Sequence, residues 1–146
     1  MLLVDTNVLI YATLRSCPEH EPCRAALAAL RAGAAPWFLT WPILYEFLRV
    51  LTHPRALAEP LAPAAAWEVV ERLLDSPSLQ LLAPTPRHAA LLAATLREVP
   101  LLRGSILHDA ATAVLMREHG VRRILTRDTG FHRFPFLEVV DPLAAG

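Results

Sequence analysis

The sequence predicts an α/β domain in which helices cover both faces of a parallel sheet. Short runs of consecutive apolar residues, such as residues 2–4 and 123–126, alternate along the chain with longer helix-like segments. Strands that are buried on both faces have this continuous apolar character, and helices between them are the usual crossovers of a parallel sheet. The chain has 146 residues and contains no repeat or linker, so we expect a single domain over residues 1–146.

The first half of the chain carries the signals of two strands and four helices. Gly33 stops the second helix, and Pro22 lies near its first turn, where Pro is favoured. Pro42 opens the third helix, and the pair His53-Pro54 ends it, because the residue before a Pro avoids helical backbone. The predicted strands are 2–4 and 37–40, and the predicted helices are 6–14, 22–33, 42–50 and, after a Pro-rich loop, 64–75.

Three more strands and two more helices are predicted in the second half. A loop around Arg103 and Gly104 separates the two helices, and Gly120 ends the second of them. The predicted strands are 79–84, 123–126 and 137–140, and the predicted helices are 86–99 and 105–119. In a parallel sheet of this kind, ligands bind outside the carboxyl ends of the strands. Polar residues that directly follow a strand are therefore the first candidates for a functional site.

The composition excludes several classes of function. The net charge is zero and all 14 basic residues are Arg, so the chain cannot supply the Lys of a P-loop or of a Schiff-base enzyme. No run of 18 or more apolar residues is free of charged residues or Pro, and no basic region precedes the first apolar stretch. We therefore expect neither a membrane span nor a signal peptide, and we expect a cytoplasmic location.

Two carboxylates follow predicted strands. Asp5 comes directly after residues 2–4, and Asp128 comes shortly after residues 123–126. Each has an ordinary local explanation, since Asp is a favoured helix cap and Asp shortly before Gly is common in turns. Asn7 could orient the Asp5 carboxylate or be a solvated residue of the first helical turn. Thr126 could donate to a carboxylate or simply finish its strand.

Two further acids lie on predicted helices. Glu46 is at the margin of the buried face of the helix 42–50, and its local alternative is a surface ion pair with Arg49. Asp109 lies in a helix that is apolar nearly all round, and no basic residue stands three or four positions away. A buried carboxylate without a partner must be neutralised or must find one elsewhere, such as a metal ion. The local alternative for Asp109 is the favourable interaction of an acid with the amino end of a helix.

Together the four acids point to a metal site. They stand at strand ends, a helix margin and a helix start, so the fold can bring them to one crevice, where neighbouring carboxylates would repel each other. A divalent cation relieves this repulsion, and a set of oxygen ligands favours Mg²⁺ or Mn²⁺ over zinc. Such sites hydrolyse phosphate esters by activating water and stabilising the charge of the displacement.

Four segments in order resemble PIN-domain ribonucleases, and more closely the VapC toxins of type II toxin–antitoxin systems. They are LLVDTNVLIYA, the Glu46 helix with the following FLRVLTHPR, GSILHDAATAVLMREHG, and TRDTGFHRFPFLEVVDPL, which together reach across essentially the whole chain. The resemblance implies a three-layer α/β/α PIN-like fold with a short, mostly parallel central sheet. It also implies dependence on Mg²⁺ or Mn²⁺, a homodimer, and a cognate antitoxin that blocks the site.

By position, the family's catalytic and metal-binding acidic quartet corresponds to Asp5, Glu46, Asp109 and Asp128, with Asn7 and Thr126 as supporting polar residues. The sequence departs from the pattern at Gly130, where many relatives have a further Asp. The departure leaves the quartet intact.

Contact with RNA requires positive charge near these acids. Residues 97–133 contain seven Arg against four acids, and metal binding would neutralise two of those acids. We expect a local basic surface from Arg103, Arg122, Arg123, Arg127 and Arg133, with Arg103, Arg127 and Arg133 as the candidate RNA-binding residues. The alternative for each is a solvated surface Arg.

The leading hypothesis is a metal-dependent endoribonuclease toxin that hydrolyses RNA phosphodiester bonds. By analogy with the family, its products carry a 5′-phosphate and a 3′-hydroxyl. The alternative is a non-catalytic PIN-like module that binds RNA or protein, although such a module has no reason to keep four poorly paired acids. A small-molecule phosphohydrolase with an Asp nucleophile is disfavoured, because Asn7 stands where such enzymes place a second Asp and the chain has no Lys.

Overall fold

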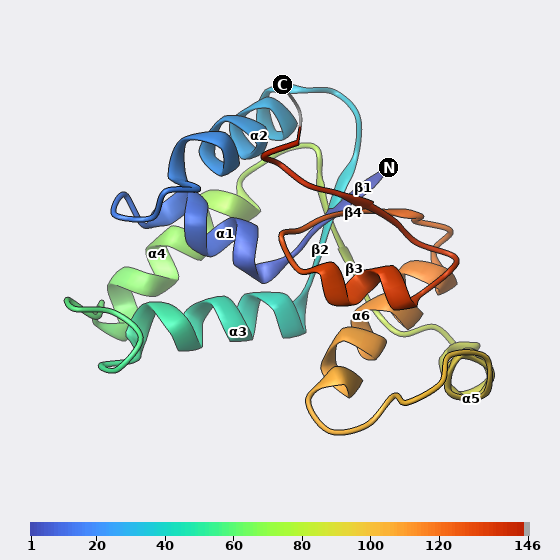
Figure 1. Ribbon diagram of the computed structural model, residues 1–146. Coiled ribbons are helices and arrows are strands. Elements are labelled where there is room, and N and C mark those ends of the chain that lie inside the picture. The colour runs from blue at the N-terminus through green and yellow to red at the C-terminus, as the bar shows by residue number, and fades with distance from the viewer. Residues whose placement is uncertain (145–146) are drawn as a thin grey trace.

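A five-stranded sheet in which every neighbouring pair of strands is parallel forms the centre of the structure (Figure 1). The structure is a computed structural model that describes residues 1–144. The order across the sheet is β3-β2-β1-β4-β5. The strands are β1 (Leu2–Val4), β2 (Trp37–Thr40), β3 (Leu79–Leu82), β4 (Arg123–Leu125) and β5 (Glu138–Val140). The prediction of a mostly parallel sheet is therefore confirmed, and the described sheet is parallel throughout.

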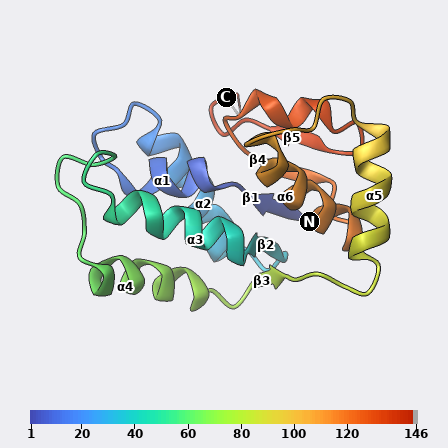
Figure 2. The same ribbon diagram turned by 90° about the horizontal axis from the view of Figure 1, so that it is seen from below.

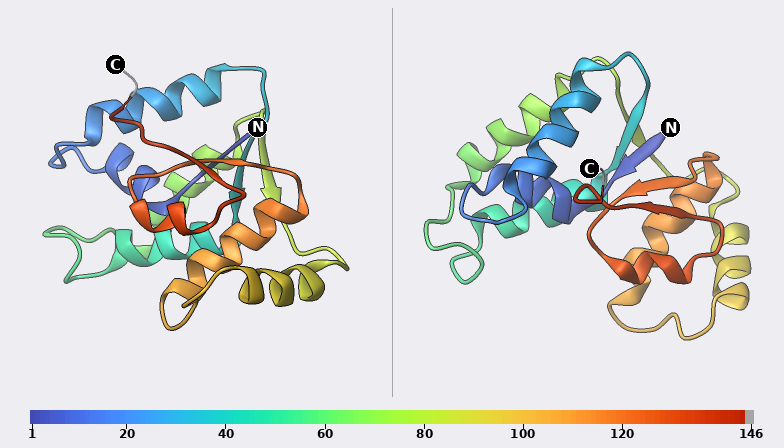
Figure 3. Two further views of the ribbon diagram at one scale, coloured as in Figure 1. Left: turned by 45° about the vertical axis from the view of Figure 1, so that its right-hand side comes forward. Right: turned by 45° about the horizontal axis from the view of Figure 1, so that its top comes forward.

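Six helices form two layers, one on each side of the sheet (Figures 2 and 3). Helices α1 to α4 pack together on one side, and α5 packs with α6 on the other. Their bounds are α1 (Thr6–Thr13), α2 (His20–Ala32), α3 (Trp41–Thr52), α4 (Pro63–Leu74), α5 (His88–Glu98) and α6 (Ile106–Glu118). This arrangement confirms the predicted three-layer α/β/α class. Among residues 1–144, no helix combines the length and the apolar character that crossing a membrane requires.

The buried faces follow the predicted apolar pattern. All four residues of β2 are buried, as are Leu3 and Val4 of β1, which is expected of central strands covered on both faces. On α3, the buried side chains Ile43, Leu44, Phe47 and Leu51 follow helical spacing and leave Glu46 on the exposed side. The core thus fixes which residues of α3 remain free to face a ligand.

The differences between predicted and observed bounds are at element ends. Helix α2 begins at His20, before Pro22, because Pro is tolerated within the first turn. The predicted strand 79–84 ends at Leu82, and Thr126 lies just beyond β4. A short 3₁₀ helix, η1 (Thr129–Arg133), was not predicted; it forms between β4 and β5, after Asp128.

The strand order reverses at β1, because successive strands are added first on one side of β1 and then on the other. The first crossovers carry the chain from β1 to β2 and β3, and the crossover through α5 and α6 then returns it to β4 on the other side of β1. At such a reversal the connections leave neighbouring strands in opposite directions, and a crevice opens outside their carboxyl ends. The residues that follow β1 and β4 are Asp5 and Thr126 with Asp128, so the fold positions them at this crevice.

Candidate active site

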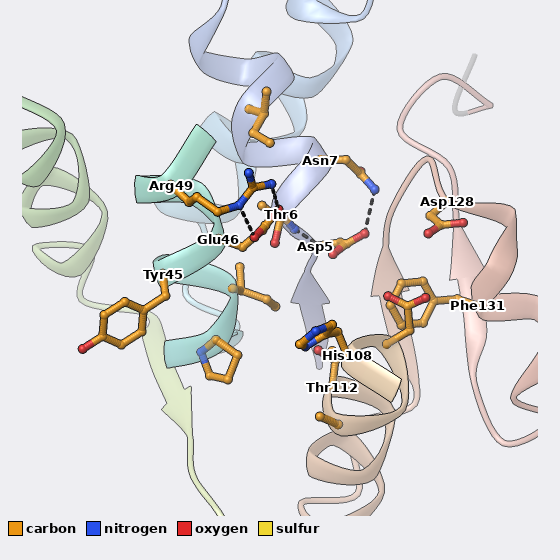
Figure 4. A pocket seen from close by; sticks show the side chains of 15 residues that line it. Asp5, Thr6, Asn7, Tyr45, Glu46, Arg49, His108, Thr112, Asp128 and Phe131 are labelled. Atoms are coloured by element: carbon orange, nitrogen blue, oxygen red, sulfur yellow. Dashed lines mark hydrogen bonds and ion pairs between the residues drawn. The ribbon is translucent and has the colours of Figure 1, made fainter. Parts of the chain in front are cut away.

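A cleft of about 640 Å³ lies at the carboxyl ends of β1 and β4 (Figure 4). It is bounded by the start of α1, the exposed side of α3, the first turns of α6, and η1 with its preceding loop. All four predicted acids line it, and Asn7 lies beside them. The polar and charged lining residues are Asp5, Thr6, Asn7, Tyr45, Glu46, Arg49, His108, Asp109, Thr112 and Asp128.

Asp5 is held in place by three donors. Its Oδ1 accepts a hydrogen bond from the Thr6 backbone N–H at 2.7 Å, so it caps α1. Its Oδ2 accepts from Asn7 Nδ2 and from the Thr126 hydroxyl, each at 2.6 Å. Burial raises the pKa of Asp5, and the charge of Asp128 adds to this effect, while the three hydrogen bonds oppose it. The local and the functional interpretations of Asp5 are therefore both compatible with its geometry.

Thr126 connects the two acids that follow strands. Its side chain is fully buried, and its hydroxyl donates to Asp5 while accepting from Asn7 Nδ2 at 3.0 Å and from the Asp128 backbone N–H at 2.9 Å. Asn7 Oδ1 in turn accepts from the Arg127 backbone N–H at 3.1 Å. These contacts tie the start of α1 to the end of β4. Asn7 and Thr126 thus both contact the Asp5 carboxylate, and their support of a metal site stays a prediction.

Asp128 caps η1 and also lines the cleft. Its Oδ1 accepts from the Gly130 backbone N–H at 2.7 Å, which is the turn chemistry that the sequence predicted as its local alternative. A Cβ atom at residue 130 would lie 2.9 Å from this oxygen, so a larger residue there would require the Asp128 carboxylate to move. The absence of a side chain at Gly130 therefore leaves room for this orientation of Asp128, and the hydrogen bond from the Gly130 N–H holds it.

Asp109 lies in the first turns of α6 and is half-buried. Within residues 1–144 its carboxylate makes no hydrogen bond and no ion pair, as the sequence predicted from the lack of basic helical neighbours. Burial, with additional repulsion from Asp128 and Asp5, raises the pKa of Asp109 from 3.8 to about 6, while Arg133 and His108 act in the opposite direction. The repulsion shows that Asp5, Asp109 and Asp128 are close enough to interact electrostatically.

Glu46 forms an ion pair with Arg49 on the same face of α3 (Figure 4). Arg49 Nε donates to Glu46 Oε2 at 2.9 Å, and an Nη of Arg49 donates to Oε1 at 2.6 Å, so both carboxylate oxygens are engaged. Arg49 holds the pKa of Glu46 below its usual range, and His108 contributes in the same direction. The predicted surface pair is present, and both of its members line the cleft.

The donor set of the cleft fits a hard divalent cation by its chemistry. Its acids supply only oxygen ligands, and the mutual repulsion of three Asp is the condition that a bound cation relieves. With the side chains as they stand among residues 1–144, no group of three or more His, Cys, Asp and Glu is close enough to hold an ion. Binding would therefore require the carboxylates to converge, and Glu46 to release at least one oxygen from Arg49.

The predicted basic surface is only partly formed. Arg133 is the exposed last residue of η1 and donates from Nε to the Gly130 carbonyl at 2.7 Å, and its charge acts on Asp109. Arg127 forms an ion pair of 2.5 Å with Asp141, and Arg103 is exposed in the loop before α6.

Arg122 and Arg123 lie at the amino end of β4, away from the cleft at its carboxyl end. Arg123 also donates to Glu138 at 3.2 Å. The expectation that these two residues share one surface with Arg127 and Arg133 is therefore wrong, because a strand separates them.

Sequence reasoning assigned no ligand-binding role to Arg49, Tyr45 or Thr112, which also line the cleft. The first two could have been found from their place on the exposed side of α3, next to Glu46. Thr112 follows Asp109 by three residues, so it lies on the same face of α6.

Comparison with known proteins agrees with this architecture. The family model described as PIN domain matches residues 2–137. The chain is 32% identical to Ribonuclease VapC48 of Mycobacterium tuberculosis over 146 residues, which cover 96% of each protein.

Two solved structures share the fold at lower identity. The crystal structure of Mycobacterium tuberculosis VapC20, a Sarcin-Ricin loop cleaving toxin, matches with a TM-score of 0.70 and 18% identity and covers 97% of this chain and 100% of that one. The structure of VapBC2 from Rickettsia felis bound to a DNA fragment from their promoter matches with a TM-score of 0.67 and 14% identity, over 95% and 96% of the two chains. The chain therefore belongs to the PIN-domain family and, within it, to the VapC ribonucleases, which are toxin endoribonucleases.

Proposed function

We propose that this chain hydrolyses RNA phosphodiester bonds at the cleft, with Asp5, Glu46, Asp109 and Asp128 as the ligands of Mg²⁺ or Mn²⁺. PIN-domain ribonucleases are in general metal-dependent, which supports the class of cofactor. The observation that carries the proposal is that all four acids line one cleft at the reversal point of the sheet. The Asp109 carboxylate, which has no partner among residues 1–144, adds to it, because burial and repulsion from Asp128 and Asp5 raise its pKa and a bound cation would relieve that repulsion.

The residues around the cleft have distinct parts in this reaction. Asp5, Glu46, Asp109 and Asp128 would hold the metal ion, which when bound would supply activation of the attacking water and stabilisation of the charge on the phosphate. Thr126 and Asn7 fix the Asp5 carboxylate, so little reorganisation of this ligand is needed. Asp109 and Asp128 complete the anionic wall opposite α3. Attack of water on phosphorus breaks the bond to the 3′-oxygen, which leaves a 5′-phosphate and a 3′-hydroxyl.

Positive charge for the RNA backbone comes from three exposed residues: Arg133 at the end of η1, Arg127 shortly after β4, and Arg103 in the loop before α6. Arg133 is the best placed, since its charge already acts on Asp109. Arg127 is partly neutralised by Asp141, so we assign it a smaller share of the binding.

The wider context is also part of the proposal. A structural neighbour is named VapBC2 and is bound to a DNA fragment from its promoter, which supports a cognate antitoxin as the partner of this chain. We further propose a homodimer and a cytoplasmic location. Co-purification of this chain with the product of an adjacent gene tests the antitoxin, and a measurement of mass in solution tests the homodimer.

The test of the site compares Asp5→Asn with Asp75→Asn, an exposed Asp at the end of α4 that lies outside the cleft. Calorimetric titration with Mn²⁺ and cleavage of single-stranded RNA are measured for both variants and for the unmodified chain. We expect Asp5→Asn to lose Mn²⁺ binding and cleavage, and Asp75→Asn to keep both. Cleavage that survives Asp5→Asn unchanged would show that the assigned site is wrong. Absence of Mn²⁺ binding in the unmodified chain would favour a non-catalytic binding module.

A further inference from the structure

The cleft contains one ion pair whose two members both line it. Among the pairs formed by residues 1–144, only Glu46–Arg49 has this property. The other pairs, such as Arg117–Glu98 and Arg24–Glu21, lie elsewhere on the surface. Among the described residues that line the cleft, Arg49 is also the only Arg, and it shares the cleft with four carboxylates. A polyanionic substrate that enters this cleft therefore meets one permanently cationic side chain in its wall.

The ion pair conflicts with the role of Glu46 as a metal ligand. Arg49 engages both carboxylate oxygens of Glu46, at 2.9 and 2.6 Å, and makes no other hydrogen bond within the described residues. A metal ion that takes an oxygen of Glu46 must displace at least one of these bonds. The guanidinium is then left without its partner, at the edge of a cleft that has to accept phosphate.

The exchange requires little energy. The side chains of Arg49 and Glu46 are 58% and 48% exposed, so water can replace either partner. Exposed pairs at this helical spacing contribute only a few tenths of a kcal/mol. A guanidinium presents the same planar fork of donors to a phosphate as to a carboxylate. Arg49 can therefore transfer its two hydrogen bonds from Glu46 to a phosphate without a change of backbone.

We propose that Arg49 is a substrate-binding latch: it holds Glu46 while the metal site is empty, and it moves to a phosphate of the RNA when a metal ion takes Glu46. The inference rests on the proposed function, because it needs Glu46 to be a metal ligand. It makes metal binding and RNA binding cooperative, since each event removes one partner of the same ion pair.

The test uses Arg49→Met, which keeps the apolar stem and removes the guanidinium. Arg24→Met is the matched control, because Arg24 forms an exposed pair with Glu21 at the same i,i+3 spacing on α2, outside this cleft. Without RNA, calorimetry should show that Arg49→Met binds Mn²⁺ about 2-fold more tightly, since the competing pair is gone. Arg24→Met should bind Mn²⁺ as the unmodified chain does.

RNA binding is measured by fluorescence anisotropy with a phosphorothioate oligoribonucleotide, which keeps its charge and resists hydrolysis. In 0.1 M salt with Mn²⁺, Arg49→Met should bind this RNA about 5-fold more weakly, the effect of one lost phosphate contact to a single strand. With EDTA in place of Mn²⁺, the loss should fall to about 2-fold relative to Arg24→Met, because in the metal-free chain Glu46 competes with the phosphate for the guanidinium, and an exposed pair of this kind is worth only a few tenths of a kcal/mol. A guanidinium that acts only through its long-range field would weaken binding equally in both conditions, and this result would overturn the proposal.

Two further outcomes separate this proposal from the proposed function. Glu46→Gln should weaken Mn²⁺ binding if Glu46 is a ligand. If it does so while Arg49→Met behaves like Arg24→Met in both assays, the latch is wrong and the metal site stands. If Glu46→Gln leaves Mn²⁺ binding unchanged, the assignment of Glu46 fails and the latch fails with it.

Discussion

Asp109 makes the metal-free protein less stable at neutral pH, and this can be tested by Asp109→Asn. Its pKa in the folded chain is raised from 3.8 to about 6. Between these values the folded state holds a proton that the unfolded state has already released, so the unfolded state binds fewer protons. The free energy of unfolding must then decrease as the pH rises from about 4 to about 6, and the loss is complete above pH 6.

The size of the effect follows from the same two values. A pKa raised from 3.8 to about 6 corresponds to at most about 3 kcal/mol. The Asp109 carboxylate is only half-buried, so solvent screening reduces this to about 1.5 kcal/mol. Replacement by Asn also removes an acid from the amino end of α6, where it contributes about 0.5 kcal/mol. We therefore expect Asp109→Asn to stabilise the metal-free protein by about 1 kcal/mol at pH 7.5, which raises Tm by roughly 3 °C.

The assay is thermal unfolding in EDTA at pH 5 and at pH 7.5, with Asp75→Asn as the control. Asp109→Asn should raise Tm at pH 7.5 and should make Tm less dependent on pH than in the unmodified chain. It should also abolish RNA cleavage, because Asp109 is a proposed ligand. A decrease in Tm at pH 7.5, or a pH dependence equal to that of Asp75→Asn, would refute the account of Asp109 as an uncompensated carboxylate.

Three other predictions concern different parts of the structure. Thr126→Val removes the hydroxyl that donates to Asp5 and accepts two N–H groups, so it should lower the free energy of unfolding by about 3 kcal/mol in denaturant titrations. Its control, Thr52→Val, removes a hydroxyl that donates only to the backbone carbonyls of Leu48 and Arg49, and it should cost less than about 1 kcal/mol. Glu118→Gln should lower stability by about 2 kcal/mol in the same titrations but leave Mn²⁺ affinity unchanged, because Glu118 is buried at the far end of α6. Arg133→Gln should reduce the slope of log affinity for single-stranded RNA against log salt concentration by about 0.7, and an unchanged slope would exclude a phosphate contact at this residue.

The sequence was sufficient to predict the fold class and the elements of the sheet. Continuous apolar runs such as residues 2–4 are typical of strands covered on both faces, and Pro and Gly mark the ends of the helices between them. The strand order was not predictable in this way. The order depends on the side of β1 to which each crossover returns the chain. The pattern of apolar residues carries no information on that side.

The sequence predicted which acids line the cleft, but it did not predict most of their contacts. Local spacing correctly gave the Glu46–Arg49 pair and the lack of helical partners for Asp109, because both are properties of a single helix. The bonds from Thr126 to Asp5 and from Asn7 to Thr126 join residues about 120 positions apart. They arise only because β1 and β4 are neighbours in the sheet. For the same reason, the split of the basic residues around β4 became visible only with the fold.

For Asp5 and Asp128, the role of helix cap and the proposed role of metal ligand do not exclude each other. A helix cap needs a single carboxylate oxygen, and Asp128 gives Oδ1 to the N–H of Gly130, which leaves Oδ2 without a hydrogen bond among residues 1–144. Capping also restricts the torsion of the side chain, because the engaged oxygen cannot move away from the helix end. Asp128 lines the cleft, so its carboxylate is held at the crevice where the strands end. Asp5 is restrained more fully, because Thr6 donates to its Oδ1 while Asn7 and Thr126 donate to its Oδ2. Capping of the elements after β1 and β4 thus helps to fix the orientation of two carboxylates that the proposed metal site requires.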